Sequence, residues 1–274
     1  MLIKEVESFL DEDLGYDDVS CTIVPDRSVE AVIFTKEDCI VAGIKEAGSI
    51  FCYLGIQAET ALKDGDRLKE GDSIFRLKGG AVSILRAERL TLNFLGHLSG
   101  IASLTRACVD IVRQHSETTR IACTRKTTPG IRKFEKLAVA AGGGDTHRFN
   151  LSDSVMIKDN HIKLMGIKAA IEAARKTSFT RKIEVEVESA EDAVLAAKLR
   201  ADIIMLDNMQ PDTVIETLGA LKEKGLRDSV IVEASGGIFQ ANLEGYAKTG
   251  VDVISMGSLI HKSRWIDISL EITF

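Results

Sequence analysis

The sequence predicts an α/β protein built in two parts. After about residue 103, strand-like runs alternate with helical stretches. This alternation implies a parallel sheet, which closes either as a barrel or as a doubly wound sheet. Before that point, short strand-like runs separated by glycines precede one helical stretch, which predicts a mixed α+β layer. The length of 274 residues fits one large domain or two smaller ones at about 150 residues per domain.

The first part contains four strand-like runs and one helix. The runs are Val29–Thr35, Ile40–Ala42, Ile56–Leu62 and Ser73–Leu77. The helical pattern covers about Ala81 to Leu98, where leucines and a phenylalanine form the apolar stripe. Gly100 follows as a helix stop signal.

The second part contains six strand-like runs with helices between them. The strands are Arg120–Cys123, Ser154–Ile157, Lys182–Val187, Asp202–Leu206, Ser229–Ala234 and Val251–Ser255. The helices are Ile131–Ala141, Lys163–Lys176, Ala190–Leu199, Asp212–Lys224 and Gln240–Lys248. Six strands are fewer than the eight of a complete barrel. No G-x-G-x-x-G follows the first strand, so the sequence does not support a dinucleotide site.

Composition and charge exclude several classes of protein. Apolar residues make up 45% and charged residues 28% of the chain, as in ordinary globular proteins. The five cysteines have no C-x-x-C spacing, which argues against a zinc site or a disulfide framework. A net charge of −6 argues against nucleic acid as a partner. No apolar run reaches the roughly 18 residues of a membrane span, and the acidic N-terminus does not resemble a signal peptide. We therefore expect a cytoplasmic protein that binds no membrane.

Positive charge is concentrated in one segment of this acidic chain. Residues 119–163 carry nine basic and four acidic side chains. The cations are interleaved with Gly, Thr and His in T-R-K-T-T-P-G at 124–130 and G-G-G-D-T-H-R at 142–148. Glycine-rich loops with Arg, Lys and His combine backbone donors with charged groups. This pattern predicts a pocket for an anionic small molecule.

Ligand-type residues lie at or just after the end of all six predicted strands of the second part. In strand order they are Arg125 with Lys126, Lys158, Glu186, Asp207, Ser235 with Gly236 and Gly237, and Gly257. Active sites of α/β barrels form at the carboxyl ends of the strands. One Asp after a strand is usually a helix cap, but six successive strand ends favour an active site.

The run K-I-E-V-E-V-E at 182–188 predicts carboxylates inside the barrel. Strand alternation places Glu184, Glu186 and Glu188 on one face, opposite an apolar face that packs on helices. Buried carboxylates need Lys, Arg or a metal as partners. Glu186 and Asp207 could share Mg²⁺, which takes one or two carboxylates plus substrate phosphates. The alternative is an exposed edge strand with one polar face.

Two late loops are typical of a phosphate site. E-A-S-G-G-I at 233–238 and S-M-G-S-L at 255–259 place small residues before helix N-termini, where backbone N–H groups can bind phosphate. The residues alone therefore predict a barrel enzyme for a phosphorylated sugar, with Mg²⁺ and a cationic pocket for a second anion.

Eight motifs, in order along nearly the whole chain, resemble the quinolinate phosphoribosyltransferase family. They lie at 86–102, 124–132, 142–153, 157–162, 184–188, 204–208, 233–238 and 254–259. The resemblance implies an N-terminal α/β sandwich plus an incomplete, seven-stranded α/β barrel. It predicts the sandwich at 1–103, with the tail 265–274 returning to it, and the catalytic barrel at 104–264. It also implies a homodimer with shared active sites.

The resemblance implies a reaction and a set of site residues. The family joins quinolinate to phosphoribosyl pyrophosphate and releases CO₂ and pyrophosphate, giving nicotinate mononucleotide in NAD synthesis. Quinolinate is assigned to Arg125, His147, Arg148 and Lys158, with Arg89 of the partner subunit. The 5′-phosphate is assigned to Ser235, Gly236 and Gly257. The pyrophosphate is assigned to Lys126 and to Mg²⁺ near Glu186 and Asp207. No other cofactor and no dedicated general base are implied.

Three other functions were weighed. Molybdenum-transport-associated paralogues share T-R-K-x-x-P-G, but we expect them to lack the Lys-Asp-Asn-His run that is intact at 158–161. A nicotinate-specific enzyme fits less well because the pocket is provisioned for two carboxylates. A non-catalytic phosphosugar sensor would not need Lys126, Glu186 and Asp207 together. The sequence leaves the choice between dimer and hexamer open.

Overall fold

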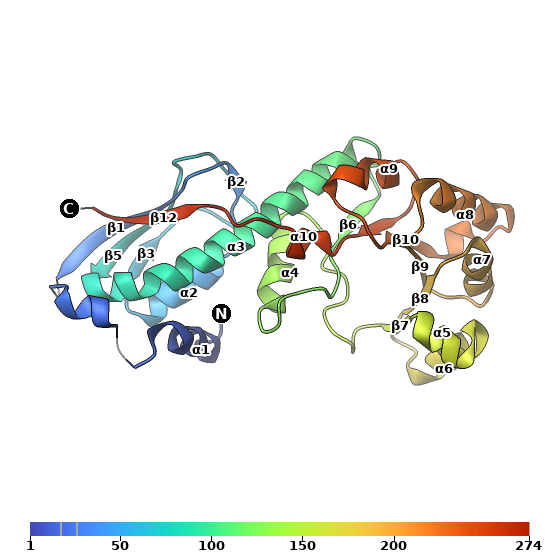
Figure 1. The fold of residues 1–274 in the computed structure, drawn as a ribbon, viewed down its shortest axis with the longest axis horizontal. Coiled ribbons are helices and arrows are strands. Elements are labelled where there is room, and N and C mark those ends of the chain that lie inside the picture. The colour runs from blue at the N-terminus through green and yellow to red at the C-terminus, as the bar shows by residue number, and fades with distance from the viewer. Residues whose placement is uncertain (17, 26, 274) are drawn as a thin grey trace. The chain divides into compact units, whose positions relative to one another are not determined.

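The computed structural model describes residues 1–16, 18–25 and 27–273, which form two compact units (Figure 1). Unit 1 comprises Met1–Leu104, Ala140–Gly143 and the C-terminal segment from Ser263. Unit 2 comprises Thr105–Val139 and Gly144–Lys262. Helix α3 (Ala81–Arg113) contributes residues to both units. No helix within the described ranges has the length and apolar character of a membrane span.

Unit 1 is built on a four-stranded antiparallel sheet of order β12-β1-β5-β3. Its strands are β1 (Ser28–Thr35), β3 (Gln57–Glu59), β5 (Ser73–Gly80) and β12 (Ile268–Thr273). A second pair joins β2 (Cys39–Ile40) to β4 (Arg67–Leu68). The helices besides α3 are α1 (Ile3–Leu14), the 3₁₀ turn η1 (Val19–Ile23) and α2 (Ile44–Tyr53). The sequence patterns did not predict α1, α2 or β4.

Helix α3 corrects the predicted helix end at Leu98–Gly100, because the helix continues to Arg113. Gly96 and Gly100 lie against the C-terminal segment of the same unit. A Cβ at Gly100 would lie 1.9 Å from the carbonyl oxygen of Arg264, and a Cβ at Gly96 would lie 2.8 Å from that of Ile266. These glycines therefore permit close packing of another segment, and they do not end the helix.

Unit 2 is built on a parallel sheet of order β6-β11-β10-β9-β8-β7. Its strands are β6 (Arg120–Ala122), β7 (Val155–Ile157), β8 (Ile183–Val187), β9 (Ile203–Asp207), β10 (Ile231–Ser235) and β11 (Val253–Ser255). Its helical segments are α4 (Arg132–Ala141), α5 (Asp159–Met165), α6 (Ile167–Thr177), α7 (Ala190–Lys198), α8 (Pro211–Glu223), η2 (Arg227–Ser229), η3 (Gln240–Asn242), α9 (Leu243–Ala247) and α10 (Ser258–His261).

The predicted parallel α/β organisation of the second part is confirmed. Each of the six strands lies within two residues of its predicted range. A one-residue parallel bridge joins Asp145 to Ala122 at the β6 edge, so a seventh position continues the six strands of the described sheet. The helix predicted over Lys163–Lys176 is two helices, because Gly166 at φ +76° separates α5 from α6.

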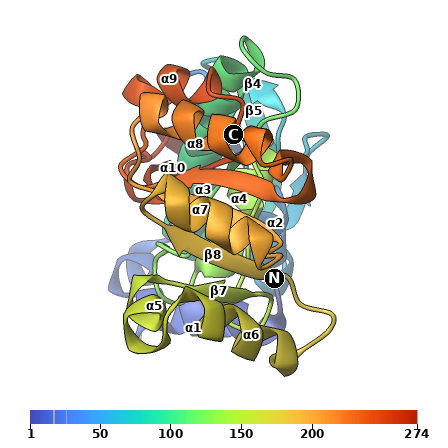
Figure 2. The same ribbon diagram turned by 90° about the vertical axis from the view of Figure 1, so that its right-hand side faces the viewer.

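Strand β8 shows how this unit separates its core from its site. Ile183, Val185 and Val187 are buried, and helices α6 and α7 pack on the neighbouring strands (Figure 2). Glu184 and Glu186 alternate with them on the opposite face, as the sequence predicted. Glu188 follows the strand and is exposed. The interior face of the sheet therefore carries charged side chains.

Candidate active site

A cavity of about 460 Å³ lies at the carboxyl edge of the parallel sheet, wholly within unit 2. The predicted site residues that line it are Arg125, Lys126, His147, Arg148, Lys158, Glu186, Asp207, Ser235 and Gly236. Gly257 lines an adjoining cavity of about 330 Å³ that shares Lys126, Ser235 and Gly236 with the first. Strand ends distant in sequence thus meet at one place, as in other α/β barrels.

The loop after β6 is held by its own polar groups. The hydroxyl of Thr124 accepts the main-chain N–H of Lys126 at 3.1 Å. Nε of Arg132 donates to the Thr127 hydroxyl at 2.9 Å, and the Glu135 carboxylate accepts the Thr128 N–H at 2.9 Å. These bonds fix the T-R-K-T segment and present Arg125 and Lys126 to the cavity.

Arg148 forms the cationic wall together with Arg125. Its Nη2 lies 2.8 Å from Sδ of Met156, another cavity residue. Burial lowers the pKa of Arg148, the negative charge of Glu184 raises it, and the positive charge of Arg125 lowers it. Two guanidinium groups close enough to affect one another form a site for an anion, because bound negative charge relieves their repulsion.

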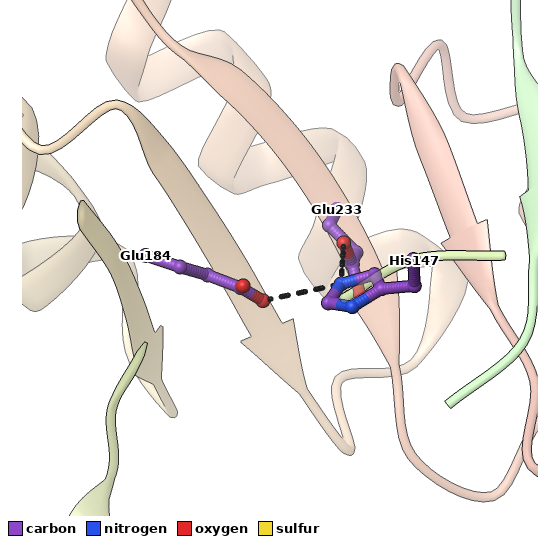
Figure 3. Close-up of side chains that lie close together, drawn as sticks. All are labelled: His147, Glu184 and Glu233. Atoms are coloured by element: carbon purple, nitrogen blue, oxygen red, sulfur yellow. Dashed lines mark hydrogen bonds and ion pairs between the residues drawn. The ribbon is translucent and has the colours of Figure 1, made fainter. Parts of the chain in front are cut away.

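His147 lies between two buried carboxylates (Figure 3). Its Nε2 is 3.2 Å from Oε2 of Glu233 and 3.6 Å from Oε1 of Glu184. Among the described residues, these three form the one group of His, Cys, Asp and Glu side chains whose ligand atoms all lie within 4.8 Å of one another. Oε1 of each glutamate accepts no hydrogen bond from the described part of the chain.

The protonation of this group follows from its surroundings. Burial of the ring lowers the pKa of His147, but the two acceptor carboxylates outweigh burial and raise the pKa to about 10. Burial raises the pKa of Glu184, the contact with His147 lowers it, and the charge of Glu233 raises it. The main-chain N–H of Arg148 donates to Nδ1 of the same ring at 2.8 Å. That hydrogen bond needs an Nδ1 without a proton, so it favours the neutral ring with its proton on Nε2 and opposes the rise in pKa.

The same cavity is lined by two further carboxylates at the ends of neighbouring strands. Glu186 on β8 accepts from Nζ of Lys158 at 2.9 Å. Asp207 ends β9, and its Oδ2 accepts from the Asn208 side chain at 2.7 Å. Burial and the nearby charge of Glu186 raise the pKa of Asp207. Two carboxylates that disfavour each other's charge form a fitting site for a cation.

The loop after β10 packs its main chain against Asn208, the residue that follows Asp207. Gly236 has φ +90°, and a Cβ there would lie 2.3 Å from Oδ1 and 2.7 Å from the main-chain nitrogen of Asn208. Asn208 itself has φ +55° and donates its N–H to the Ser235 carbonyl at 2.8 Å. Gly236 is therefore required by both its conformation and the space available.

Sequence reasoning missed several residues of these cavities. The sequence indicated Glu233 only as the first residue of the glycine loop at 233–238, and Asn208 only as the last residue of the motif at 204–208. The smaller cavity also contains Phe239, His261 and Lys262, with Lys262 Nζ 4.7 Å from the centre of the Phe239 ring. Position in the sequence could have indicated His261 and Lys262, because they lie about one helical turn after Gly257.

Arg89 is the one predicted site residue outside unit 2. It is exposed on the part of α3 that belongs to unit 1. Within the described residues it forms no hydrogen bond or ion pair. The described part of the chain therefore gives this arginine no polar partner.

Comparisons with known proteins agree along the whole chain. Residues 18–99 and 101–271 match the models of the N-terminal and C-terminal domains of quinolinate phosphoribosyl transferase. The chain is 48% identical to a probable nicotinate-nucleotide pyrophosphorylase (carboxylating) of Methanothermobacter thermautotrophicus, covering 97% of each chain. It is 38% identical to the human protein named nicotinate-nucleotide pyrophosphorylase (carboxylating), covering 97% of this chain and 90% of that one. The solved nicotinate-nucleotide pyrophosphorylase of Francisella tularensis matches with a TM-score of 0.92 at 35% identity, covering 98% of this chain and 95% of that one.

Proposed function

Because the chain belongs to the quinolinate phosphoribosyl transferase family, we propose that it is a Mg²⁺-dependent nicotinate-nucleotide pyrophosphorylase (carboxylating). It transfers the phosphoribosyl group of phosphoribosyl pyrophosphate to quinolinate and releases pyrophosphate and CO₂. The observation that carries this proposal is the presence of both signs of charge in one cavity. Two guanidinium groups, two carboxylates and a glycine loop line the same space.

The cationic wall suits a dicarboxylate. Arg125, Arg148 and Lys158 surround the same space, with His147 beside them. An arginine fork binds a carboxylate through two parallel hydrogen bonds, and quinolinate has two adjacent carboxylates. A pocket built for nicotinate alone would bury more positive charge than its ligand neutralises. We therefore assign the pyridine dicarboxylate to this wall.

The glycine loops suit the phosphoribosyl group. Ser235 and Gly236 follow β10, and Gly257 precedes the short helix α10. Main-chain N–H groups can approach a phosphate closely only where no Cβ intervenes. We assign the 5′-phosphate to these loops, in the smaller cavity. His261 and Lys262, which line that cavity, add further positive charge.

The residues present fit a magnesium ion. Glu186 and Asp207 line the cavity, and the raised pKa of Asp207 reflects burial and the neighbouring charge of Glu186. Glu186 and Asp207 would hold the ion, which would supply charge neutralisation for the leaving pyrophosphate. Lys126 lies in both cavities and is assigned to the same pyrophosphate.

In this chemistry the protein binds and orients the two substrates and neutralises the charge of the leaving pyrophosphate. The lone pair of the pyridine nitrogen attacks C1 of the ribose, and the C1–oxygen bond to pyrophosphate breaks. The positive nitrogen of the pyridinium formed stabilises the electron pair that stays on C2 when the C2 carboxylate leaves as CO₂, and C2 then takes a proton from water. The attacking nitrogen of ionised quinolinate carries no proton to be removed, so no dedicated general base is assigned.

We further propose a homodimer in which Arg89 of the partner subunit completes the quinolinate site. Its exposure, with no hydrogen bond or ion pair to residues 1–16, 18–25 or 27–273, supports this role. The deciding experiment incubates purified protein with Mg²⁺ and phosphoribosyl pyrophosphate and offers quinolinate, nicotinate and uracil in turn. We expect pyrophosphate release with quinolinate alone, accompanied by stoichiometric CO₂. Turnover with nicotinate and not quinolinate contradicts the substrate assignment, and no turnover with any substrate contradicts the proposed activity.

A further inference from the structure

We propose that Glu233, assisted by Glu184, is a positioning residue that fixes the His147 ring and thereby the direction of the Arg148 guanidinium. This inference rests on the proposed function, because Arg148 is there assigned to quinolinate. The argument concerns the turn at residues 145–148 and the charged groups beneath it, all within unit 2.

The turn holds a conformation that its sequence does not favour. His147 has φ +51°, in the left-handed region that residues with a Cβ seldom adopt. Such a conformation persists where surrounding contacts determine it. Two of these contacts are local, since Asp145 Oδ1 accepts the His147 N–H at 2.7 Å and His147 Nδ1 accepts the Arg148 N–H at 2.8 Å.

Two charged groups from other elements hold the two central residues of the turn, Thr146 and His147. Lys136 on α4 is 1% exposed, and its Nζ donates to the carbonyl of Thr146. The His147 ring reaches Glu233 at 3.2 Å. The Nε2–H donor of this contact exists in both the neutral Nε2–H ring and the imidazolium. The contact with Glu233 therefore does not depend on the charge of the ring.

The carboxylates come from strands that do not adjoin one another. Glu233 lies on β10 and Glu184 on β8, with β9 between them. The ring of His147 lies above this sheet between the two side chains (Figure 3). Strands β8 and β10 thus hold the ring, and helix α4 holds the residue before it through Lys136. The next residue along the chain is Arg148.

Stability alone does not explain this arrangement. Glu184 is 1% exposed and Glu233 is 2% exposed, and each has an oxygen without a hydrogen-bond donor among the described residues. Buried ionic groups are often no more stabilising than apolar residues of similar volume. Their use here is geometric, because they direct a strained turn that carries a binding arginine.

The test combines binding and ring spectroscopy. Glu233→Ala removes the acceptor, and we expect the Kd for quinolinate to rise about tenfold, as for loss of one hydrogen bond to a charged group. The Kd for phosphoribosyl pyrophosphate should change by less than about twofold, because the residues assigned to it do not contact His147. Glu233→Gln keeps an acceptor and should recover most of the quinolinate affinity.

Two controls separate positioning from general damage to the strand. Val232→Ala truncates the fully buried neighbour of Glu233 on β10 and should leave the Kd for quinolinate unchanged. The double variant of Glu233→Ala and His147→Ala should bind no more weakly than His147→Ala alone, because both changes break the same linkage. Additive losses, or an equal loss in Val232→Ala, would overturn the proposal.

Ring spectroscopy decides the matter without any substrate. In protein labelled with ¹⁵N-histidine, the His147 ring signals are those that vanish in His147→Ala. We expect Glu233→Ala to shift the Nε2 signal and Val232→Ala to leave it in place. An unshifted Nε2 signal in Glu233→Ala overturns the positioning role even if quinolinate is turned over. Failure of the wild type to bind quinolinate overturns the proposed function but leaves this spectroscopic result decisive for Glu233.

Discussion

Lys158 Nζ lies 2.9 Å from Glu186 Oε2, so two residues assigned to different ligands are bonded to each other. The ion pair joins the end of β7 to β8. In the proposed complex, Lys158 faces a substrate carboxylate and Glu186 faces a cation. The substrate carboxylate would thus replace Glu186 as the partner of Lys158, and the cation would replace Lys158 as the partner of Glu186.

The carboxylate pair provides the first prediction. Glu186→Gln and Asp207→Asn each remove a negative charge proposed to hold Mg²⁺ and its pyrophosphate. Turnover should fall by about 10²-fold or more, as when one charge-stabilising group is removed elsewhere. The variants should fold, because near-isosteric amides relieve buried negative charge. Steady-state assays over a range of Mg²⁺ concentrations measure the effect.

Glu188→Gln is the matched control for these variants. Glu188 continues the same alternation but is exposed beyond the end of β8, so its amide should retain wild-type turnover. Chelation of divalent cations should abolish wild-type turnover, and added Mg²⁺ should restore it. Near-normal rates in both Glu186→Gln and Asp207→Asn would exclude the metal role of these carboxylates.

The glycine loop provides the second prediction, through two neighbouring positions. Gly236 and Gly237 both have positive φ, at +90° and +63°. A Cβ added at Gly236 would collide with Asn208. A Cβ added at Gly237 would have no neighbouring atom of the described residues within 4 Å. Gly236→Ala should therefore raise the KM for phosphoribosyl pyrophosphate and lower the melting temperature more than Gly237→Ala.

Binding measurements test which sub-site Gly236 serves. The Kd for quinolinate, measured by calorimetry, should be similar in Gly236→Ala and the wild type. Gly236→Val, with its larger side chain, should show the same selectivity more strongly. If quinolinate binding is lost and phosphoribosyl pyrophosphate binding is retained, the two sub-sites have been assigned the wrong way round.

Arg89 provides the third prediction. Arg89→Ala and Arg148→Ala should each be nearly inactive when assayed alone. In a mixed dimer, an Arg148→Ala chain supplies an intact Arg89 to the intact barrel of an Arg89→Ala chain, which makes one complete site. Equal mixing makes about half of the dimers mixed, so activity should recover to about a quarter of wild type.

Subunit exchange needs its own readout in this experiment. Differently tagged chains, co-purified after refolding, measure the fraction of mixed dimers. Recovery that scales with this fraction supports the shared site. A mixture that stays at the level of the separate variants, despite confirmed exchange, shows that Arg89 does not act on the partner's barrel.

Glu37 provides the fourth prediction, which concerns stability and pH in unit 1. Its carboxylate accepts from both terminal nitrogens of Arg264 and from the main-chain N–H of Asp267 at 3.0 Å. The hydrogen bonds from Arg264, followed by the one from Asp267, lower the pKa of Glu37 below its ordinary value of 4.5. Glu37→Gln should lower the free energy of unfolding by about 1.5–3 kcal/mol at pH 7, the range for hydrogen bonds to charged groups.

The sign of the pH dependence follows from the lowered pKa. The stabilisation by Glu37 is fully present above its ordinary pKa of 4.5 and is lost as the pH falls through the lower folded-state pKa. The difference in urea unfolding between wild type and Glu37→Gln should therefore shrink at acid pH. Glu30→Gln, at an exposed pair with Lys78, is the control and should change stability little at either pH. A difference that persists unchanged at acid pH contradicts this account.

The sequence by itself determined the parallel sheet and most of the cavity residues. Strand alternation and the spacing of strand and helix are local properties, and parallel strands bring their carboxyl ends to one edge. Residues placed after strands, such as Lys126, Lys158 and Asp207, therefore had to meet once six such strands formed one sheet. The same alternation placed Glu184 and Glu186 on the interior face.

Only the tertiary structure decided which side chains contact one another. The glycines of α3 had the pattern of a helix end, but the approach of Arg264 and Ile266 shows that they allow close packing. Glu233 had the pattern of a phosphate loop, but the fold places it against His147, 86 residues away in sequence. Local pattern fixes the face and the strand end of a residue. The partner at that position depends on strand order and on turns such as that at His147, whose left-handed backbone is imposed by contacts from other elements.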